Sequence, residues 1–250
     1  MDRIVFTAGG GAARTLEHQA TVSNNLANAS SPGFRAQLTQ YRAVPIIGAG
    51  LATRVGTVAA TPGADFTPGP MEVTGRALDI AIQGSGWLSA LMPDGSEGLT
   101  RAGGLQIGAD GTLQTADGRQ LLSVDNQPVV VPEGASLTIG TDGTLTALGA
   151  GDDPVGLIGL GQLKLSDPNP ASLVRGGDGY FRVQGQPLGQ PVPADPLVRV
   201  VSGAVEGSNV SPIEAMVSMI DNGRRFEMQM KVVQHADTNA ERANRLLSAG

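Results

Sequence analysis

Residues 211–250 follow one spacing, and it constrains the fold of the chain more than any other feature of the sequence. The segment opens as a helix does, with Ser211 as the N-cap, Pro212 as the first helical residue and Glu214 closing a capping box. Residues then recur at alternating steps of three and four: Met216, Met219, Gly223, Phe226, Met230, Val233, Asp237, Ala240, Asn244 and Leu247. This pattern predicts a long helix with a coiled-coil seam, and such a seam needs a partner to cover it.

A second helix is predicted near the start of the chain, from about Asp2 to Asn28. Its stripe of small and apolar residues contains Val5, Ala8, Ala12, Leu16, Ala20, Ser23 and Leu26. Gly9 to Gly11 interrupt the stripe, and each lowers helix stability by about 1 kcal/mol relative to Ala. We therefore expect a helix that is weak alone, ends near Pro32-Gly33 and pairs with the C-terminal helix as a coiled coil.

The middle of the chain has the pattern of short β-strands. Leu78, Ile80 and Ile82 alternate onto one face, and Asp-Gly pairs recur at 94–95, 110–111, 117–118 and 142–143. Such pairs favour β-hairpins with type I′ turns. An internal repeat aligns Leu105–Thr115 with Leu137–Ala147, where seven of eleven positions are identical. Two copies are too few for a solenoid, so the repeat predicts two similar hairpins in one domain.

These patterns predict an α+β fold in which a β-rich domain of hairpins is flanked by N- and C-terminal helices. We place an N-terminal helix and turn at 1–33, an extended or irregular Pro-rich connector at 34–75, the central β domain at 76–205, and the C-terminal helix at 206–250. A helix pair at the two ends of one chain, with a seam still to be covered, indicates an assembly protein.

Composition excludes several classes of protein. The chain has no Cys, which excludes disulfides and thiolate chemistry. No apolar run approaches the roughly 18 residues of a membrane-spanning helix. Residues 1–20 lack the continuous apolar core of a cleaved secretory signal, so we expect any export to use another route.

The charge is segregated along the chain. The net charge is −6, residues 1–42 carry +2 and residues 211–250 are neutral, so residues 43–210 carry −8. An acidic middle argues against a nucleic-acid partner, which requires a clustered basic face. It favours a part that faces water, while the nearly neutral ends favour segments that pack against other surfaces.

Residues with catalytic or metal-binding chemistry are sparse. His18 and His235 lie on separate predicted helices, where we expect solvated faces. Ser85 between Gly84 and Gly86 lacks the following helix of a nucleophile elbow, and the Asp-Gly pairs lack the further acids of a calcium loop. We predict no catalytic residue, no cofactor and no metal site. A secreted β-rich hydrolase with helical arms and a cytoplasmic coiled-coil scaffold remain as alternatives.

Three stretches resemble one family, the flagellar rod and hook proteins. The N-terminal signature of that family resembles Ser23-Asn-Asn-Leu-Ala-Asn-Ala-Ser-Ser-Pro-Gly-Phe-Arg35. Its central β motif resembles Leu78-Asp-Ile-Ala-Ile-Gln-Gly-Ser-Gly-Trp87 with Leu99-Thr-Arg-Ala-Gly103 after it. Its C-terminal motif resembles Ser202-Gly-Ala-Val-Glu-Gly-Ser-Asn-Val210, followed by a helix that contains Arg225-Phe-Glu-Met-Gln-Met-Lys231. The order and spacing also match, so the resemblance covers the whole chain.

The resemblance implies a structural subunit with no catalytic site. Gly86-Trp87 and Leu163-Lys-Leu-Ser166 are most similar to proximal rod members, with a distal rod or hook subunit as the alternative. Members of this family are exported by the flagellar type III apparatus, transmit torque and surround the export channel. The implied partners are further copies of the chain, other rod proteins and the export apparatus, and the implied location is the periplasmic part of the basal body, with no membrane insertion.

The candidate site is a subunit interface on the two helices. Its predicted members are Val5, Ala8, Ala12, Leu16, Asn24, Asn25, Asn28, Met216, Met219, Phe226, Met230, Val233, Asp237, Ala240, Asn244 and Leu247. The apolar members supply contact area that is buried on association. The polar members Asp237 and Asn244 can fix the register of the paired helices at a cost in stability.

Overall fold

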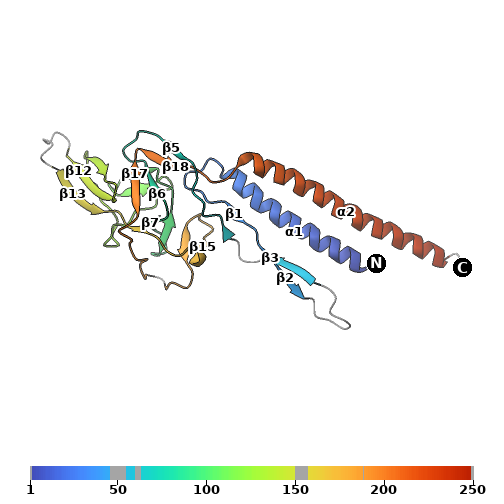
Figure 1. Ribbon diagram of the computed structural model, residues 1–250. Helices are drawn as coiled ribbons and strands as arrows, with labels where there is room; N and C mark the ends of the chain where they lie inside the picture. The colour runs from blue at the N-terminus through green and yellow to red at the C-terminus, as the bar shows by residue number, and fades with distance from the viewer. Residues whose placement is uncertain (1, 46–54, 60–62, 150–156, 188, 249–250) are drawn as a thin grey trace. The chain divides into compact units, whose positions relative to one another are not determined.

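A computed structural model describes residues 2–45, 55–59, 63–149, 157–187 and 189–248. The chain divides into two compact units (Figure 1). The helical unit comprises Met1–Ala29, Ala36–Asp65 and Val210–Gly250, and the β unit comprises Ser30–Arg35 and Phe66–Asn209.

Two antiparallel helices that lie side by side dominate the helical unit (Figure 1). Helix α1 spans Asp2–Ala27 and α2 spans Pro212–Ser248. The same unit contains the hairpin of β2 (Tyr41–Pro45) with β3 (Val55–Ala59), and the short pair of β1 (Gln37–Leu38) with β4 (Gly63–Ala64). Within the segment 34–75, which we expected to be extended or irregular, the described residues thus form several short strands, and residues 46–54 and 60–62 lie outside the described residues.

The predicted start and end of α1 and the predicted start of α2 are confirmed to within a residue. The backbone N–H of Glu214 donates to Ser211 Oγ at 3.4 Å, and that of Ala215 donates to the Ser211 carbonyl at 3.0 Å. Ser211 is therefore the N-cap of α2. Helix α1 ends just before Asn28, whose N–H still donates to the carbonyl of Asn24. Pro32 and Gly33 follow outside the helix, as the sequence predicts.

Within the single chain, only part of the predicted seam of α2 is covered. The least exposed residues of α2 are Ala215, Ser218, Met219, Asn222, Phe226, Gln229, Val233, Ala236, Ala240 and Ala243. The row Met219, Phe226, Val233 and Ala240 was predicted. The other predicted row, Met216, Gly223, Met230, Asp237 and Asn244, lies one residue away from the covered face and is exposed, as is Leu247 at the end of the first row. The row that is covered carries Ala, Asn and Gln, because α1 offers small and polar residues opposite it.

The predicted stripe of α1 is likewise only partly covered within the single chain. Ala12 is buried and Ala8 and Leu26 are half-buried, but Val5, Leu16, Ala20 and Ser23 are exposed. The covered face instead contains Gly11, Thr15, His18, Gln19 and Val22. The expectation of a solvated His18 is wrong, because its ring lies against Asn222 of α2, whereas His235 is exposed.

The β unit is built of antiparallel strands only, among the residues that are described. A five-stranded sheet has the order β14-β7-β8-β16-β15, a three-stranded sheet has the order β11-β12-β13, and the pairs β9–β10, β6–β17 and β5–β18 complete the unit. Strands β5 to β10 span Met71–Val73, Ile80–Gln83, Trp87–Leu91, Glu97–Thr100, Leu105–Ile107 and Leu113–Thr115. Strands β11 to β14 span Ser136–Ile139, Thr144–Leu148, Leu157–Gln162 and Leu165–Ser166. A 3-10 turn, η1 (Pro170–Ser172), precedes strands β15 to β18, which span Leu173–Arg175, Phe181–Val183, Arg199–Ser202 and Ala204–Glu206.

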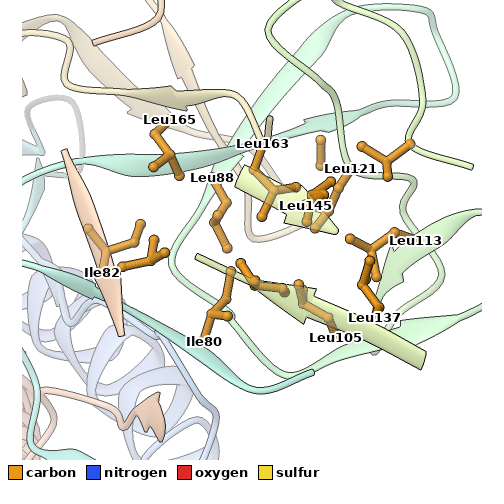
Figure 2. Close-up of a cluster of buried hydrophobic side chains, with 14 of the residues drawn as sticks. Ile80, Ile82, Leu88, Leu105, Leu113, Leu121, Leu137, Leu145, Leu163 and Leu165 are labelled. Carbon is orange, nitrogen blue, oxygen red and sulfur yellow. The ribbon is translucent and has the colours of Figure 1, made fainter. Parts of the chain in front are cut away.

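The internal repeat forms two equivalent hairpins, as predicted. Leu113 pairs with Ile107 between β9 and β10, and Leu145 pairs with Ile139 between β11 and β12. The repeated residues therefore occupy the same register. Their leucines meet in one aliphatic core with Ile80, Ile82, Leu88, Leu121, Leu163 and Leu165 (Figure 2).

The Asp-Gly turns form hairpin loops, but not of type I′. The N–H of Gly95 donates to the carbonyl of Met92, and the N–H of Met92 donates to the carbonyl of Ser96, both at 2.9 Å. Gly95 has φ +78°, and Asp94 does not have a positive φ. This is a type I turn followed by a left-handed glycine, which spares Asp the conformation that only Gly adopts without strain. The loops at Gly111, Gly118 and Gly143 repeat this geometry.

Candidate assembly site

A buried ionic cluster within the β unit joins the three stretches that carry the family resemblance. Arg35 comes from the first stretch, Arg101 from the second and Glu206 from the third. Arg35 Nη2 lies 2.7 Å from Glu206 Oε1, and Arg101 Nη1 lies 2.7 Å from Glu206 Oε2. The side chains of Arg35 and Glu206 are 1% and 2% exposed. The carboxylate of Glu206 therefore forms ion pairs with two guanidinium groups, and all three side chains are almost fully buried.

Backbone groups complete this cluster. Arg101 donates to the carbonyl of Gly86 at 2.9 Å and to the carbonyl of Gly84, and Arg35 Nη1 donates to the carbonyl of Thr67 at 2.9 Å. The N–H of Gly69 donates to Glu206 Oε1 at 2.9 Å. Buried charges are tolerated when they are paired and accept or donate further hydrogen bonds of this kind.

Gly33 allows the first stretch to reach the cluster. Its φ is +69°, and a Cβ there would lie 2.2 Å from the carbonyl carbon of Arg101. Any side chain would collide with the backbone at that distance. The N–H of Gly33 donates to the Glu206 carbonyl at 2.7 Å, so the segment that follows α1 is bonded directly to the segment that precedes α2.

Aromatic residues cover the cluster. Trp87, Phe66 and Phe181 contact one another with ring centroids 4.8 to 5.9 Å apart. The guanidinium of Arg101 lies 5.7 Å from the Trp87 ring. The guanidinium of Arg175 lies 4.1 Å from the Phe34 ring, and burial lowers the pKa of Arg175 from its usual value. Contacts of this kind stabilise a cation that has lost water.

Two further polar contacts hold the β unit together. Lys164 Nζ, itself buried, donates to Glu97 Oε2 at 2.9 Å and to Asn126 Oδ1 at 2.6 Å. Burial raises the pKa of the Asp79 carboxyl, but hydrogen bonds from Arg76 and Thr74 lower it by more, so its pKa lies below the usual range. The Lys164 contacts join segments far apart in the sequence, whereas the Asp79 contacts lie within the stretch that precedes β6.

The exposed apolar surface lies mainly on the helical unit. Ile4, Phe6 and Leu16 of α1 are exposed, and Leu16 retains 54% of its surface. On α2 the exposed apolar residues are Ile213, Met216, Val217, Ile220, Met228, Met230, Val232, Leu246 and Leu247. Ile4, Ala8, Met228 and Val232 line one open groove of about 620 Å³ between the two helices. Apolar area of this extent indicates a surface for association.

The structure divides the predicted interface residues into two groups. Ala8, Ala12, Met219, Phe226, Val233 and Ala240 have low exposure. Val5, Leu16, Asn24, Met216, Met230, Asp237, Asn244 and Leu247 are exposed. Asn28 is half-buried and caps the end of α1 by donating to the Asn24 carbonyl at 2.9 Å. Asn25 pairs with the backbone of Gln37, donating to its carbonyl at 2.9 Å and accepting from its N–H at 2.8 Å.

Sequence reasoning missed the ionic cluster, although all three residues stand inside the quoted motifs. The available signal was a charged residue set directly beside small or apolar motif residues, as in Phe34-Arg35 and Val205-Glu206. Among the described residues, no group of three or more His, Asp and Glu side chains is placed to hold a metal ion. The described helices include none that is long and apolar enough to cross a membrane.

Comparison with known proteins gives matches along the whole chain. Residues 7–35 match the model of the flagella basal body rod protein, residues 81–147 the flagellar hook protein FlgE/F/G D1 domain, and residues 201–246 the flagellar basal body rod FlgEFG protein C-terminal model. Each matched segment supplies one residue of the ionic cluster.

Curated relatives extend this result over full length. The flagellar basal-body rod protein FlgF of Salmonella typhimurium and that of Escherichia coli are each 49% identical to this chain over 251 residues, which covers 99% of both chains. The flagellar basal-body rod protein FlgG of Agrobacterium fabrum is 32% identical over 88% of this chain and 89% of its own.

Proposed function

The chain belongs to the flagellar basal-body rod protein family, and we propose that it is the proximal rod subunit of its flagellum. The protein is structural and is not an enzyme. The observation that carries the assignment within the family is identity of 49% over 99% of both chains to two FlgF proteins, against 32% to a FlgG protein. This difference favours the proximal type over a distal rod or hook subunit, which is the remaining alternative.

Assembly follows from the surface of the helical unit. Helices α1 and α2 pair as a coiled coil, and their exposed apolar residues pack against further copies of the chain and against other rod proteins. Residues such as Leu16, Met216 and Leu247 are exposed in the single chain, which supports this role. The segments 1–33 and 206–250 are then the assembly segments, and residues 76–205 form the body of the subunit.

The location and route follow from membership of the family. The subunit is exported by the flagellar type III apparatus and is built into the rod in the periplasmic space. There it surrounds the export channel and transmits torque. The charge of −8 on residues 43–210 supports exposure of the β unit to water, because a strongly acidic surface resists non-specific association.

Incorporation into basal bodies tests this function. Leu16→Ser combined with Leu247→Ser removes exposed apolar area and leaves the covered face of the helix pair intact. We expect a folded subunit that is strongly reduced in isolated basal bodies, with loss of motility. Glu241→Gln, another exposed change on α2, is the matched control and should be incorporated normally. Normal incorporation of the double variant would contradict the assembly surface, and absence of the parent protein from basal bodies would contradict the function itself.

A further inference from the structure

The covered face between α1 and α2 contains two polar layers. In the first, the amide nitrogen of Asn222 lies 2.8 Å and its oxygen 3.0 Å from His18 Nδ1, so the amide can serve either tautomer of the imidazole. Asn222 is 4% exposed. In the second, Thr15 Oγ1 lies 3.2 Å from Gln229 Oε1, one heptad further along α2.

The second layer also depends on the missing side chain of Gly11. A Cβ on Gly11 would lie 2.8 Å from Gln229 Nε2, so the amide of Gln229 occupies the space that a side chain would fill. Gly9 and Gly10 have no atom within 4 Å of the corresponding position. Of the three consecutive glycines, only Gly11 thus accommodates a side chain of α2.

Both layers match in one register only. If α2 moved by one heptad, either Ala215 would lie opposite His18 or Ala236 would lie opposite Gly11. Each shift removes the partner of a buried polar group, and a buried polar group left without a partner destabilises the shifted register. The apolar row of Met219, Phe226 and Val233 discriminates less, because one aliphatic or aromatic contact replaces another after a shift.

We propose that His18–Asn222 and Gly11/Thr15–Gln229 act as a register lock, which fixes the antiparallel alignment of α1 against α2. These residues are positioning residues for the assembly surface: they determine which exposed side chains of the two helices stand next to one another. A polar residue in an otherwise apolar seam is a known means of setting register at a cost in stability. The inference rests on the helix pairing that the proposed function also uses.

Disulfide trapping in the free, full-length subunit tests the lock, and the absence of native Cys makes the experiment clean. Ala8→Cys with Val232→Cys reports the observed register, since both residues line the same groove. Ala8→Cys with Arg225→Cys or with Asn239→Cys reports a shift of one heptad, which is about 10 Å along the helix. In the parent we expect the first bond to form at least about tenfold faster than the other two, because a disulfide requires Cα atoms within about 7 Å.

Replacement of the polar layers should remove this preference. In Asn222→Leu/Gln229→Leu, and separately in His18→Leu/Asn222→Leu, we expect off-register trapping to rise at least about tenfold, which corresponds to about 1.4 kcal/mol. Gln234→Leu/Thr238→Leu makes the same kind of polar-to-apolar change at exposed positions of α2 and should trap as the parent does. Helix content from circular dichroism and the unfolding of the β unit should stay unchanged in every variant.

Exclusive trapping of the observed register in both polar-layer variants would overturn the proposal. A subunit in which no pair is trapped, the parent included, would overturn the helix pairing on which it rests. Neither outcome concerns whether the parent protein is found in basal bodies, so failure of the lock is distinguishable from failure of the proposed function.

Discussion

The two units differ in where they place charged and apolar side chains. The β unit buries charged groups and pairs them, as with Arg35, Arg101 and Glu206 in one cluster and Lys164 with Glu97 in another. The helical unit leaves large apolar side chains in water, including Leu247 at 82% exposure, and places polar residues on its covered face. These buried charges of the β unit are thus paired within one chain, whereas the helical unit holds most of the exposed large apolar side chains.

This difference predicts which property a mutation in each unit should change. A substitution in the β unit should change the stability of the single chain, because strands far apart in sequence share one core. A substitution on the helical unit should change local opening and association more than global stability, since a pair of helices buries little area. The single Trp, Trp87, lies in the β unit and reports the unfolding of that unit separately.

The largest effect is expected from Glu206→Ala. It leaves Arg35 and Arg101 buried without their shared carboxylate, and breaking a buried ion pair costs about 3–5 kcal/mol. Urea unfolding followed by Trp87 fluorescence should show this loss in the free energy of unfolding. Glu72→Ala removes an exposed carboxylate on β5 and should change stability by less than about 0.5 kcal/mol. Equal effects of the two substitutions would contradict the role of the cluster.

A pair of core substitutions sharpens the contrast between the units. Leu145→Ala removes a fully buried side chain from the aliphatic core and should lower the stability of the β unit by about 2–5 kcal/mol. Phe226→Ala on α2 should leave the Trp87 transition unchanged, because Phe226 is only half-buried in the other unit. Its effect should appear as faster amide exchange in α1 and α2. A shift of the Trp87 transition by Phe226→Ala would show that the two units unfold together.

Local sequence patterns predicted the elements well and their partners less well. The N-cap at Ser211, the end of α1 and the equivalent hairpins of the repeat depend on residues close in sequence, and all are confirmed. The seam of α2 depends on what lies opposite. Met216 and Met230 are more apolar than Ala215 and Asn222, so hydrophobicity alone favoured the row that the single chain leaves exposed. The residues of α1 that lie opposite α2 are small and polar, and they cover the row of Ala215 and Asn222 instead.

Local sequence patterns could not predict the ionic cluster, for a related reason. Arg35, Arg101 and Glu206 come from three separate stretches, and nothing in any one stretch shows that the other two charges lie beside it. The turn type was also misassigned, because Asp-Gly is compatible with both type I′ and type I loops. The carboxylate decides between them: Asp110 Oδ1 accepts the N–H of Thr112 at 3.1 Å and its hydroxyl at 2.7 Å.

A smaller effect is expected at the start of α2. Ser211→Ala removes the N-cap acceptor and should cost about 1 kcal/mol of helix stability. Amide exchange in the first turn of α2 should accelerate about fivefold, while the Trp87 transition stays in place. Ser211→Asn, which keeps an acceptor at the cap, is the matched control. A lowered Trp87 transition in Ser211→Ala would mean that the helix start contributes to the core of the β unit.

The smallest expected effect is a loss of stability of the β unit at low pH, which should arise from the Asp residues in its hairpin turns. Hydrogen bonds from Ser96, Thr112 and Thr144 lower the pKa values of Asp94, Asp110 and Asp142 below the ordinary value of 3.8. A carboxyl whose pKa is lower in the folded state than in the unfolded state stabilises the fold above its unfolded pKa, and this stabilisation is lost as the pH falls through the folded pKa. The β unit should therefore lose stability below about pH 4, and the loss should be seen as a falling urea midpoint of Trp87 fluorescence between about pH 5 and pH 2.

The triple substitution Asp94→Asn, Asp110→Asn and Asp142→Asn tests this assignment. Asn keeps an oxygen acceptor for the turn and cannot titrate, so the variant should show a shallower fall of the midpoint than the parent over the same pH range. Asp221→Asn, Asp237→Asn and Glu241→Gln change the same number of carboxyl groups on exposed positions of α2, and the Trp87 profile of that variant should follow the parent's. If the turn variant also follows the parent's profile, the acid sensitivity of the β unit arises from carboxyl groups other than the hairpin turns.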